Sequence, residues 1–214
     1  MSRGGALATL SPLAAEQWGM FTAVQARELQ VSRVDLSRLI QDGTLERVET
    51  AARVYRLTGS PPDPDLDDLR AAWLQLGEGL ASAGRLREPD AVVSHRSAAA
   101  ALDLGDLLAD MHEFYSPTRR RLRRTDVRIR VRADLPAGTW RVVRGLPVTT
   151  AARVVSDLLA DREDESAVAR IVQDALRADL LNRAELDEIV PDHLAAYGAP
   201  TAAALSETLA GSRR

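Results

Sequence analysis

Cysteine is absent from this sequence, which excludes disulfide bonds, thiolate nucleophiles and thiolate metal sites. Lysine is absent as well, so all 28 basic residues are arginines. P-loop nucleotide hydrolases, Schiff-base enzymes and the lysine-dependent nuclease motifs all require an amine that this chain lacks. The absence of cysteine and lysine therefore excludes several classes of enzyme and metal site.

Aromatic residues, histidines and long apolar runs are also scarce. Aromatic residues make up 4% of the chain, and none lies among the arginines of 119–132, so a site that stacks single-stranded bases is not indicated. The three histidines, His95, His112 and His193, are too scattered for a metal-ligand pattern, and we expect neither metal nor cofactor. No run is long and apolar enough for a signal peptide or membrane span, so we expect a cytoplasmic protein.

The net charge of −3 conceals an uneven distribution. Residues 1–60 carry 7 arginines and 6 acidic residues, and 61–118 carry 4 and 11. Residues 119–144 carry 10 and 2, and 145–214 carry 7 and 12. An argument for nucleic-acid binding must therefore rest on local charge, because the chain as a whole is acidic.

The segment from Thr22 to Tyr55 has the pattern of a winged helix-turn-helix. Thr22 and Gln25 have the spacing of a capping box, which predicts a helix over 23–29. Ser32 begins a second helix after a short turn, with Asp35 three residues on, and helices joined so closely must cross steeply.

The second helix has an apolar face at i, i+3, i+4 spacing, formed by Leu36, Leu39 and Ile40. Gly43 is a natural stop after it. Residues 45–48 and 54–57 are short apolar runs on either side of a polar tip, which predicts the hairpin of a wing.

The remaining chain predicts an α+β fold with two domains. We expect a loose leader over 1–10 and a winged helix-turn-helix domain over 11–59, whose first helix begins at Ser11 and runs to Trp18. The proline-rich stretch 60–65 predicts a linker. A mixed α/β domain follows over 66–210, with several short strands and, near the end of the chain, helices.

Taken together, these segments resemble the AbiEi family of antitoxins and transcriptional regulators. The winged module is followed by VVSHRSAAAALDL, by HEFYSP, by an arginine cluster and by GLPVTTAARVVSDLL, and the resemblance covers roughly 16–178. It implies an antitoxin that represses its own operon and whose second domain counteracts a nucleotidyltransferase-type toxin, directly or indirectly. The chain departs from the family where glycine is frequent, with Gln30 in the turn and Arg53 before the wing's Val-Tyr pair.

If the winged module binds double-stranded operator DNA, the second helix enters the major groove, where arginine can pair with guanine. The candidate DNA-binding residues on it are Ser32, Arg33, Ser37, Arg38 and Gln41. Arg53 at the wing tip would meet phosphate or the minor groove. The alternative is that the module binds another protein and these side chains only solvate the helix.

Three interpretations fit the arginine-rich block between 119 and 144. It adds phosphate contacts beside the winged domain, it docks an acidic or RNA-bound partner such as the toxin, or it pairs internally with the acidic helices after Gly145. The candidate arginines are Arg119, Arg120, Arg121, Arg123, Arg124, Arg128, Arg130 and Arg132.

Catalytic patterns are weak. Ser94 beside His95 suggests a nucleophile and its base, but neighbours at a helix start should point apart, so we expect a capping serine and a packed histidine, and no enzyme. An acidic group near the end of a helix fits a solvated surface better than a cation site. That group comprises Asp157, Asp161, Glu163, Asp164 and Glu165. The main rival function is a regulator unrelated to any toxin, with a ligand-sensing or oligomerising second domain.

Overall fold

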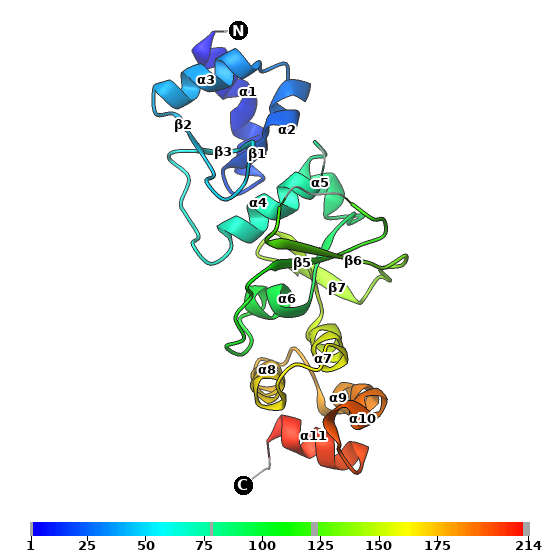
Figure 1. Cartoon of the computed structure of the whole chain (residues 1–214). Helices are drawn as coiled ribbons and strands as arrows, with labels where there is room; N and C mark the ends of the chain where they lie inside the picture. The colour runs from blue at the N-terminus through cyan, green and yellow to red at the C-terminus, as the bar shows by residue number, and fades with distance from the viewer. Residues whose placement is uncertain (1, 78, 121–123, 212–214) are drawn as a thin grey trace. The chain divides into compact units, whose positions relative to one another are not determined.

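The computed structural model describes residues 2–77, 79–120 and 124–211. Contacts within the chain divide it into two compact units, Met1–Ala91 and Val92–Arg214. The first contains a small antiparallel sheet with helices, and the second contains a five-stranded mixed sheet with helices (Figure 1). The expected α+β class, a winged helix-turn-helix followed by a mixed α/β region, is confirmed.

The first unit is a winged helix with two further helices. Its elements are α1 (Arg3–Ala15), β1 (Met20–Thr22), α2 (Ala23–Glu28), α3 (Arg33–Gln41), β2 (Leu45–Arg47), β3 (Val54–Leu57), α4 (Asp67–Leu76) and α5 (Ser82–Arg85). The three strands pair antiparallel in the order β1-β3-β2. The wing hairpin is confirmed by the pairing of β2 with β3, whereas β1 was not predicted.

Both capping boxes of the helix-turn-helix are present. The hydroxyl of Thr22 accepts the backbone N–H of Gln25 at 3.2 Å, and the amide oxygen of Gln25 accepts the N–H of Thr22 at 2.8 Å. Ser32 and Asp35 form the same reciprocal pair at the start of α3. Gly43, with φ of +74°, follows the end of α3 in the left-handed conformation that favours glycine.

The expectation of a loose leader over 1–10 was wrong. Helix α1 begins at Arg3, after a cap in which Ser2 accepts the N–H of Gly5. Ala6, Leu10 and Ala14, spaced four residues apart, are fully buried and give this segment a reason to be helical that its glycines and Pro12 concealed. The hydroxyl of Ser11 donates to the carbonyl of Leu7 at 2.8 Å, so Ser11 lies inside the helix and does not begin it.

Helix α4 belongs to the first compact unit. It packs against β1 and β3, and the guanidinium of Arg56 on β3 donates to the carboxylate of Asp67 in the first turn of α4. The proline-rich stretch 60–65 thus connects two elements of one compact unit. The assignment of a domain boundary to this stretch stays a prediction.

The second unit contains a mixed sheet in the order β6-β5-β4-β8-β7. Its strands are β4 (Val92–Val93), β5 (His112–Ser116), β6 (Val127–Val131), β7 (Trp140–Val143) and β8 (Leu146–Thr149). β4 pairs parallel with β8 and β5 with β6, while β4 with β5 and β7 with β8 are antiparallel.

Helices of the second unit pack in succession away from the sheet (Figure 1). They are α6 (His95–Ala101), α7 (Ala151–Ala160), α8 (Glu165–Arg177), α9 (Arg183–Ile189), the 3-10 turn η1 (Val190–His193), α10 (Leu194–Tyr197) and α11 (Ala202–Ala210). Helix α6 contacts β5 and β8, α7 contacts α6, and α8 and α9 contact α7. Within the described residues, no helix has the length and apolarity needed to cross a membrane.

Candidate nucleic-acid interface

A pocket of about 580 Å³ opens between α2, α3 and the wing of the first unit. It is lined by Ala23, Val24, Arg27, Val31, Ser32, Arg33, Leu36, Ser37, Ile40, Arg47, Arg53 and Tyr55. We call it the arginine groove, because four of these residues are arginines and none is acidic. Its apolar floor comes from the core of the winged helix.

All four arginines of the groove, Arg27, Arg33, Arg47 and Arg53, are exposed. In the part of the chain that the structure describes, none of them forms an ion pair with a carboxylate. The guanidinium of Arg47 lies 5.6 Å from the centre of the Tyr55 ring, which holds it at the groove by a cation–π contact. Like charges gathered in this way favour a polyanion that can contact several of them at once.

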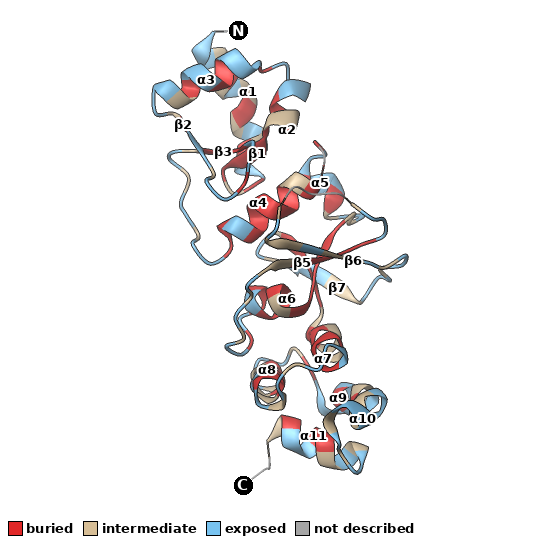
Figure 2. Ribbon diagram, in the orientation of Figure 1, coloured by how far each residue is buried: buried red, intermediate tan, exposed pale blue. Residues whose placement is uncertain are grey.

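The structure brings together four of the six predicted DNA-binding residues. Ser32, Arg33 and Ser37 of α3 line the groove together with Arg53 of the wing. Arg38 and Gln41 are exposed on α3 but are not among the residues that line the groove. Figure 2 shows that α3 carries both buried and exposed residues. The predicted DNA contacts of these residues are not tested by their positions and stay predictions.

Ser32 has a structural duty as well. Its hydroxyl donates to the carboxylate of Asp35 at 2.6 Å and accepts the N–H of Asp35 at 3.2 Å. The hydrogen bond from the Ser32 hydroxyl lowers the pKa of Asp35 below its usual range. Because this proton is already engaged, Ser32 can offer a DNA ligand only a lone pair.

Sequence reasoning missed Arg27 and Arg47. Arg27 lies in the last turn of α2 and Arg47 at the end of β2, so neither belongs to the helix expected to enter the major groove. Only the packing of the wing beside α2 and α3 places them next to Arg33. In the sequence, nothing distinguishes Arg27 and Arg47 from the other arginines, of which the chain has 28 in all.

Two residues beside the groove have left-handed backbones. Gln30 has φ of +62° and Arg53 has φ of +65°, and these are the positions where the resembling family often has glycine. The turn therefore retains the backbone conformation that glycine adopts most readily. The carbonyl of Arg53 accepts the N–H of Ala23 at 2.9 Å, so this conformation ties the wing tip to the start of α2.

The buried side chains of Gln17 and Gln25 fix the position of α2 by hydrogen bonds. The side-chain amide of Gln25 donates to the amide oxygen of Gln17 at 2.9 Å and to the carbonyl of Leu80 at 3.0 Å. The amide oxygen of Gln17 also accepts the N–H of Ser82 at 3.1 Å. Gln17 is 0% and Gln25 is 3% exposed, so these bonds must stay satisfied for α2 to keep its place.

Most of the described arginines in the 119–144 block have partners inside the second unit. Arg128 and Arg130 donate to Glu113 on the neighbouring strand at 3.3 Å and 3.1 Å. Arg130 also donates to Asp161 at the end of α7, at 3.0 Å, and Arg124 pairs with Asp126. Of these contacts, that of Arg130 with Asp161 is the predicted pairing with the acidic helices after Gly145, whereas Glu113 and Asp126 precede Gly145.

The other arginines of the block are placed differently. Arg120 donates to the hydroxyl of Ser116 at 3.2 Å, and the guanidinium of Arg132 lies 5.5 Å from the centre of the Tyr115 ring. Arg119 is exposed. Arg121 and Arg123 lie outside the described residues. Phosphate or partner contacts by any of these residues stay predictions.

The expectation that Ser94 and His95 point apart was wrong. The Nδ1 atom of His95 lies 2.9 Å from the hydroxyl oxygen of Ser94, and Ser94 does not cap α6 through its side chain. His95 has φ of +53°, a left-handed conformation at the first residue of the helix, and neighbours there need not follow the helical spacing. Ser94 is 0% and His95 3% exposed, so the pair is buried in the second unit, where the His95 ring also lies 4.0 Å from Asp157 and 3.9 Å from Asp161.

Four of the five acidic residues near the end of α7 are engaged by arginines or by the backbone, and Asp157, at 3% exposed, does not lie on the solvated surface that we expected. Asp157 forms an ion pair with Arg153 and accepts the Tyr115 hydroxyl at 2.7 Å, while both oxygens of Glu163 accept from Arg96 at 2.7 Å. Asp164 caps α8 by accepting the N–H of Ala167. Among the described residues, no three histidine or acidic side chains are arranged to hold a metal ion.

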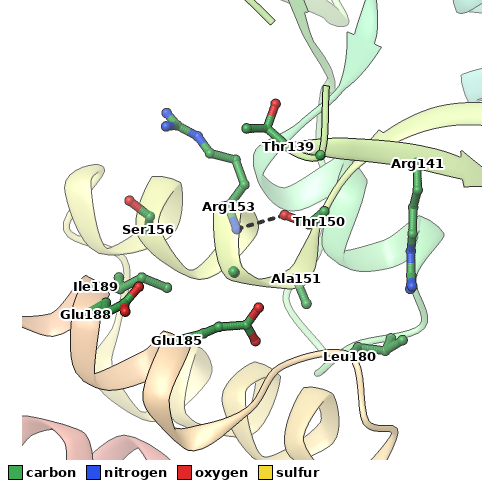
Figure 3. A pocket seen from close by; sticks show the side chains of 12 residues that line it. Thr139, Arg141, Thr150, Ala151, Arg153, Ser156, Leu180, Glu185, Glu188 and Ile189 are labelled. Atoms are coloured by element: carbon green, nitrogen blue, oxygen red, sulfur yellow. Dashed lines mark hydrogen bonds between the residues drawn. The ribbon is translucent and has the colours of Figure 1, made fainter. Parts of the chain in front are cut away.

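The second unit has a cavity of about 430 Å³ between β7, α7 and α9 (Figure 3). Thr139, Arg141, Thr150, Arg153 and Ser156 provide hydrogen-bond donors on one side. Glu185 and Glu188 of α9 lie opposite, with Leu180 and Ile189 as apolar surface. A small polar molecule with groups of both charges could be accommodated here.

The winged helix and its arginine groove define the class of the first unit, a winged-helix domain with a basic groove. Residues 9–49, which extend from within α1 to the wing, match the family described as "Transcriptional regulator, AbiEi antitoxin". This segment is therefore similar to an AbiEi-type antitoxin and regulator domain, as the resemblance predicted. No curated protein matches the chain.

Proposed function

We propose that this protein is a non-enzymatic, cytoplasmic antitoxin that represses its own toxin–antitoxin operon. The first unit binds double-stranded operator DNA, and the second counteracts a cognate nucleotidyltransferase-type toxin, directly or indirectly. The observation that carries the DNA-binding half is the arginine groove, in which four exposed arginines from α2, α3 and the wing meet with no acidic residue in the lining. The match of residues 9–49 to an antitoxin family supports the toxin half.

The positions of these residues suggest that some contact the bases of the duplex and others contact its phosphates. The N-terminal half of α3 enters the major groove, where Arg33 and Arg38 can pair bidentately with guanine. Arg27, Arg47 and Arg53 contact the flanking phosphates and fix the register of the domain. Phosphate contacts supply sequence-independent affinity, and each weakens steeply as salt rises.

The test is equilibrium binding of the full chain to its own upstream DNA and to a scrambled duplex at about 0.15 M salt. We expect preference for the native duplex, lost in the double variant Arg33→Ala with Arg38→Ala. A matched control removes two exposed arginines from the second unit, Arg177→Ala with Arg183→Ala, and should keep the preference. Equal weak binding of the unmodified protein to both duplexes would refute operator recognition.

The toxin half needs a separate experiment. A nucleotidyltransferase encoded beside this gene should arrest growth when it is expressed alone. Co-expression of this protein should relieve that arrest. The Arg33→Ala with Arg38→Ala variant should still relieve it when produced from an unrelated promoter, because these residues lie in the DNA-binding unit. Persistent arrest with the unmodified protein would contradict the antitoxin assignment and leave operator binding untouched.

A second candidate is a regulator with no toxin, in which the second unit senses a small ligand or oligomerises. The cavity between β7, α7 and α9 is the observation that favours ligand sensing. In that case a small-molecule extract of the host cells should change operator affinity, and Arg141→Ala with Glu188→Ala should abolish the response. No change in affinity would count against ligand sensing.

A further inference from the structure

Val34 is an apolar residue exposed at the start of the proposed recognition helix. It is the second residue of α3, and 59% of its surface is accessible. Valine is a poor choice for an exposed helical position, because its branched side chain loses rotamer freedom and leaves apolar surface in water. The residue suits this place better if a partner covers it.

Val34 lies at the centre of the outward face of α3. With 3.6 residues per turn, it points nearly opposite the buried Leu36 and Leu39. Arg33 and Ser37 flank it on the side of the arginine groove, and Arg38 flanks it on the other side. A partner that contacts the arginines of this face therefore also covers Val34.

The charge of the surroundings selects a nucleic acid as that partner. The groove beside Val34 contains four exposed arginines and no acidic side chain, which complements a phosphate backbone. In the major groove of a duplex, thymine is distinguished by its C5-methyl group, the feature that apolar side chains contact. The isopropyl group of valine has no donor or acceptor with which to pair with the other base edges.

We propose that Val34 reads thymine in the operator by contact with its C5-methyl group. The inference rests on the proposed function and adds an apolar, base-specific contact to the polar ones. It predicts an operator in which thymine adjoins the bases paired by Arg33 or Arg38. It also predicts sensitivity to a change in the DNA of a single methyl group per base.

The experiment compares two duplexes of the same upstream DNA, one synthesised with thymine and one with deoxyuridine at every thymine position. Deoxyuridine retains the pairing edge and the O4 acceptor and lacks only the methyl group. The unmodified full chain should bind the uracil duplex at least about fourfold more weakly, the factor expected for one methyl-sized group withdrawn from water. Val34→Ala should bind the thymine duplex more weakly and show little discrimination between the two duplexes.

The controls separate this contact from other effects of uracil on the duplex. Val142→Ala removes the same groups from another half-exposed valine, on β7 of the second unit, and should discriminate as the unmodified protein does. The role of Val34 would be overturned if Val34→Ala still distinguished the thymine duplex from the uracil duplex, or if the unmodified protein bound both equally. The proposed repressor function would survive either result as long as the protein preferred its native upstream DNA to the scrambled duplex. If even that preference were absent, the proposed function would fail and Val34 with it.

Discussion

Replacing Arg53 with glycine should separate the backbone role of this residue from its charge. Arg53 has φ of +65°, a conformation that costs an L-residue about 1–2 kcal/mol. Glycine removes that cost and adds roughly 0.5–1 kcal/mol of conformational entropy lost on folding. The free energy of unfolding of Arg53→Gly should therefore be unchanged or higher by up to about 1.5 kcal/mol.

Operator affinity should change in the opposite direction. The Arg53 side chain lines the arginine groove, and its carbonyl, which accepts the N–H of Ala23, is unaffected by the substitution. If the guanidinium contacts one phosphate, its loss should reduce the slope of log affinity against log salt by about 0.9. The variant should thus be as stable as the original protein and bind DNA less tightly.

Arg53→Ala is the matched comparison. It removes the same charge as Arg53→Gly, so the two variants should show the same salt slope. It keeps a Cβ in the left-handed conformation, so its unfolding free energy should be lower than that of Arg53→Gly. Urea unfolding and DNA titrations at several salt concentrations measure both quantities. An unchanged salt slope would refute the phosphate contact, and an alanine variant more stable than the glycine variant would refute the strain argument.

Three further variants test the packing around the two units. Gln25→Ala should lower the unfolding free energy by about 2–4 kcal/mol, since it removes the buried hydrogen bonds of the Gln25 side chain to Gln17, to the N–H of Thr22 and to the carbonyl of Leu80; a loss below about 1 kcal/mol in urea titrations would contradict this. Arg130→Gln should lower the unfolding free energy by about 1–3 kcal/mol, because it removes the hydrogen bonds from Arg130 to Glu113 and Asp161. Operator affinity should stay within about twofold, since both partners lie in the second unit; a large loss of affinity would instead favour a phosphate contact by Arg130. Burial lowers the pKa of His95, so its contribution to stability is present above pH of about 6.5, the unfolded value, and is lost as pH falls below it. His95→Gln should therefore flatten the decline in urea midpoint between about pH 6.5 and 5, whereas an unchanged decline would assign it to other groups such as His193, whose pKa burial also lowers.

The sequence predicted best where a structure is determined by neighbours along the chain. The capping boxes of α2 and α3, the stop at Gly43 and the wing hairpin each depend on residues within a few positions of one another. The three-residue strand β1 has no such signature, because it exists through its pairing with β3. Helix α1 was hidden for a related reason: its buried face is defined by the core that it joins, while its glycines and proline suggested a loop.

The candidate site shows the same limit. The periodicity of α3 identified Arg33 and Ser37 as exposed, but the approach of Arg27 and Arg47 depends on how the wing folds back. Val34 was not singled out from the sequence, because the pattern that defines the buried face does not identify the apolar residues that remain outside it. The contact of Ser94 with His95 depends on a left-handed backbone that helical spacing does not anticipate.

Pairing, more than net charge, decides where this chain can bind a polyanion. The first 60 residues have nearly balanced charges, yet three of their six acidic residues have partners other than the arginines of the groove. Asp35 is held in the cap of α3, Asp42 pairs with Arg3 at 3.0 Å, and Glu46 lies 4.0 Å from Arg56. The groove arginines are thereby left without carboxylate partners among the described residues.

The block over 119–144 is the reverse case. It has the highest density of arginine in the chain, but Arg124, Arg128 and Arg130 face carboxylates of their own unit. A polyanion would have to displace these carboxylates and leave Glu113, which is 4% exposed, without its cationic partners. Binding at the arginine groove demands no such exchange, so we expect the weakly charged winged domain to be the better DNA-binding surface. Arg128 and Arg130 join β6 to β5, and Arg130 also joins it to the end of α7.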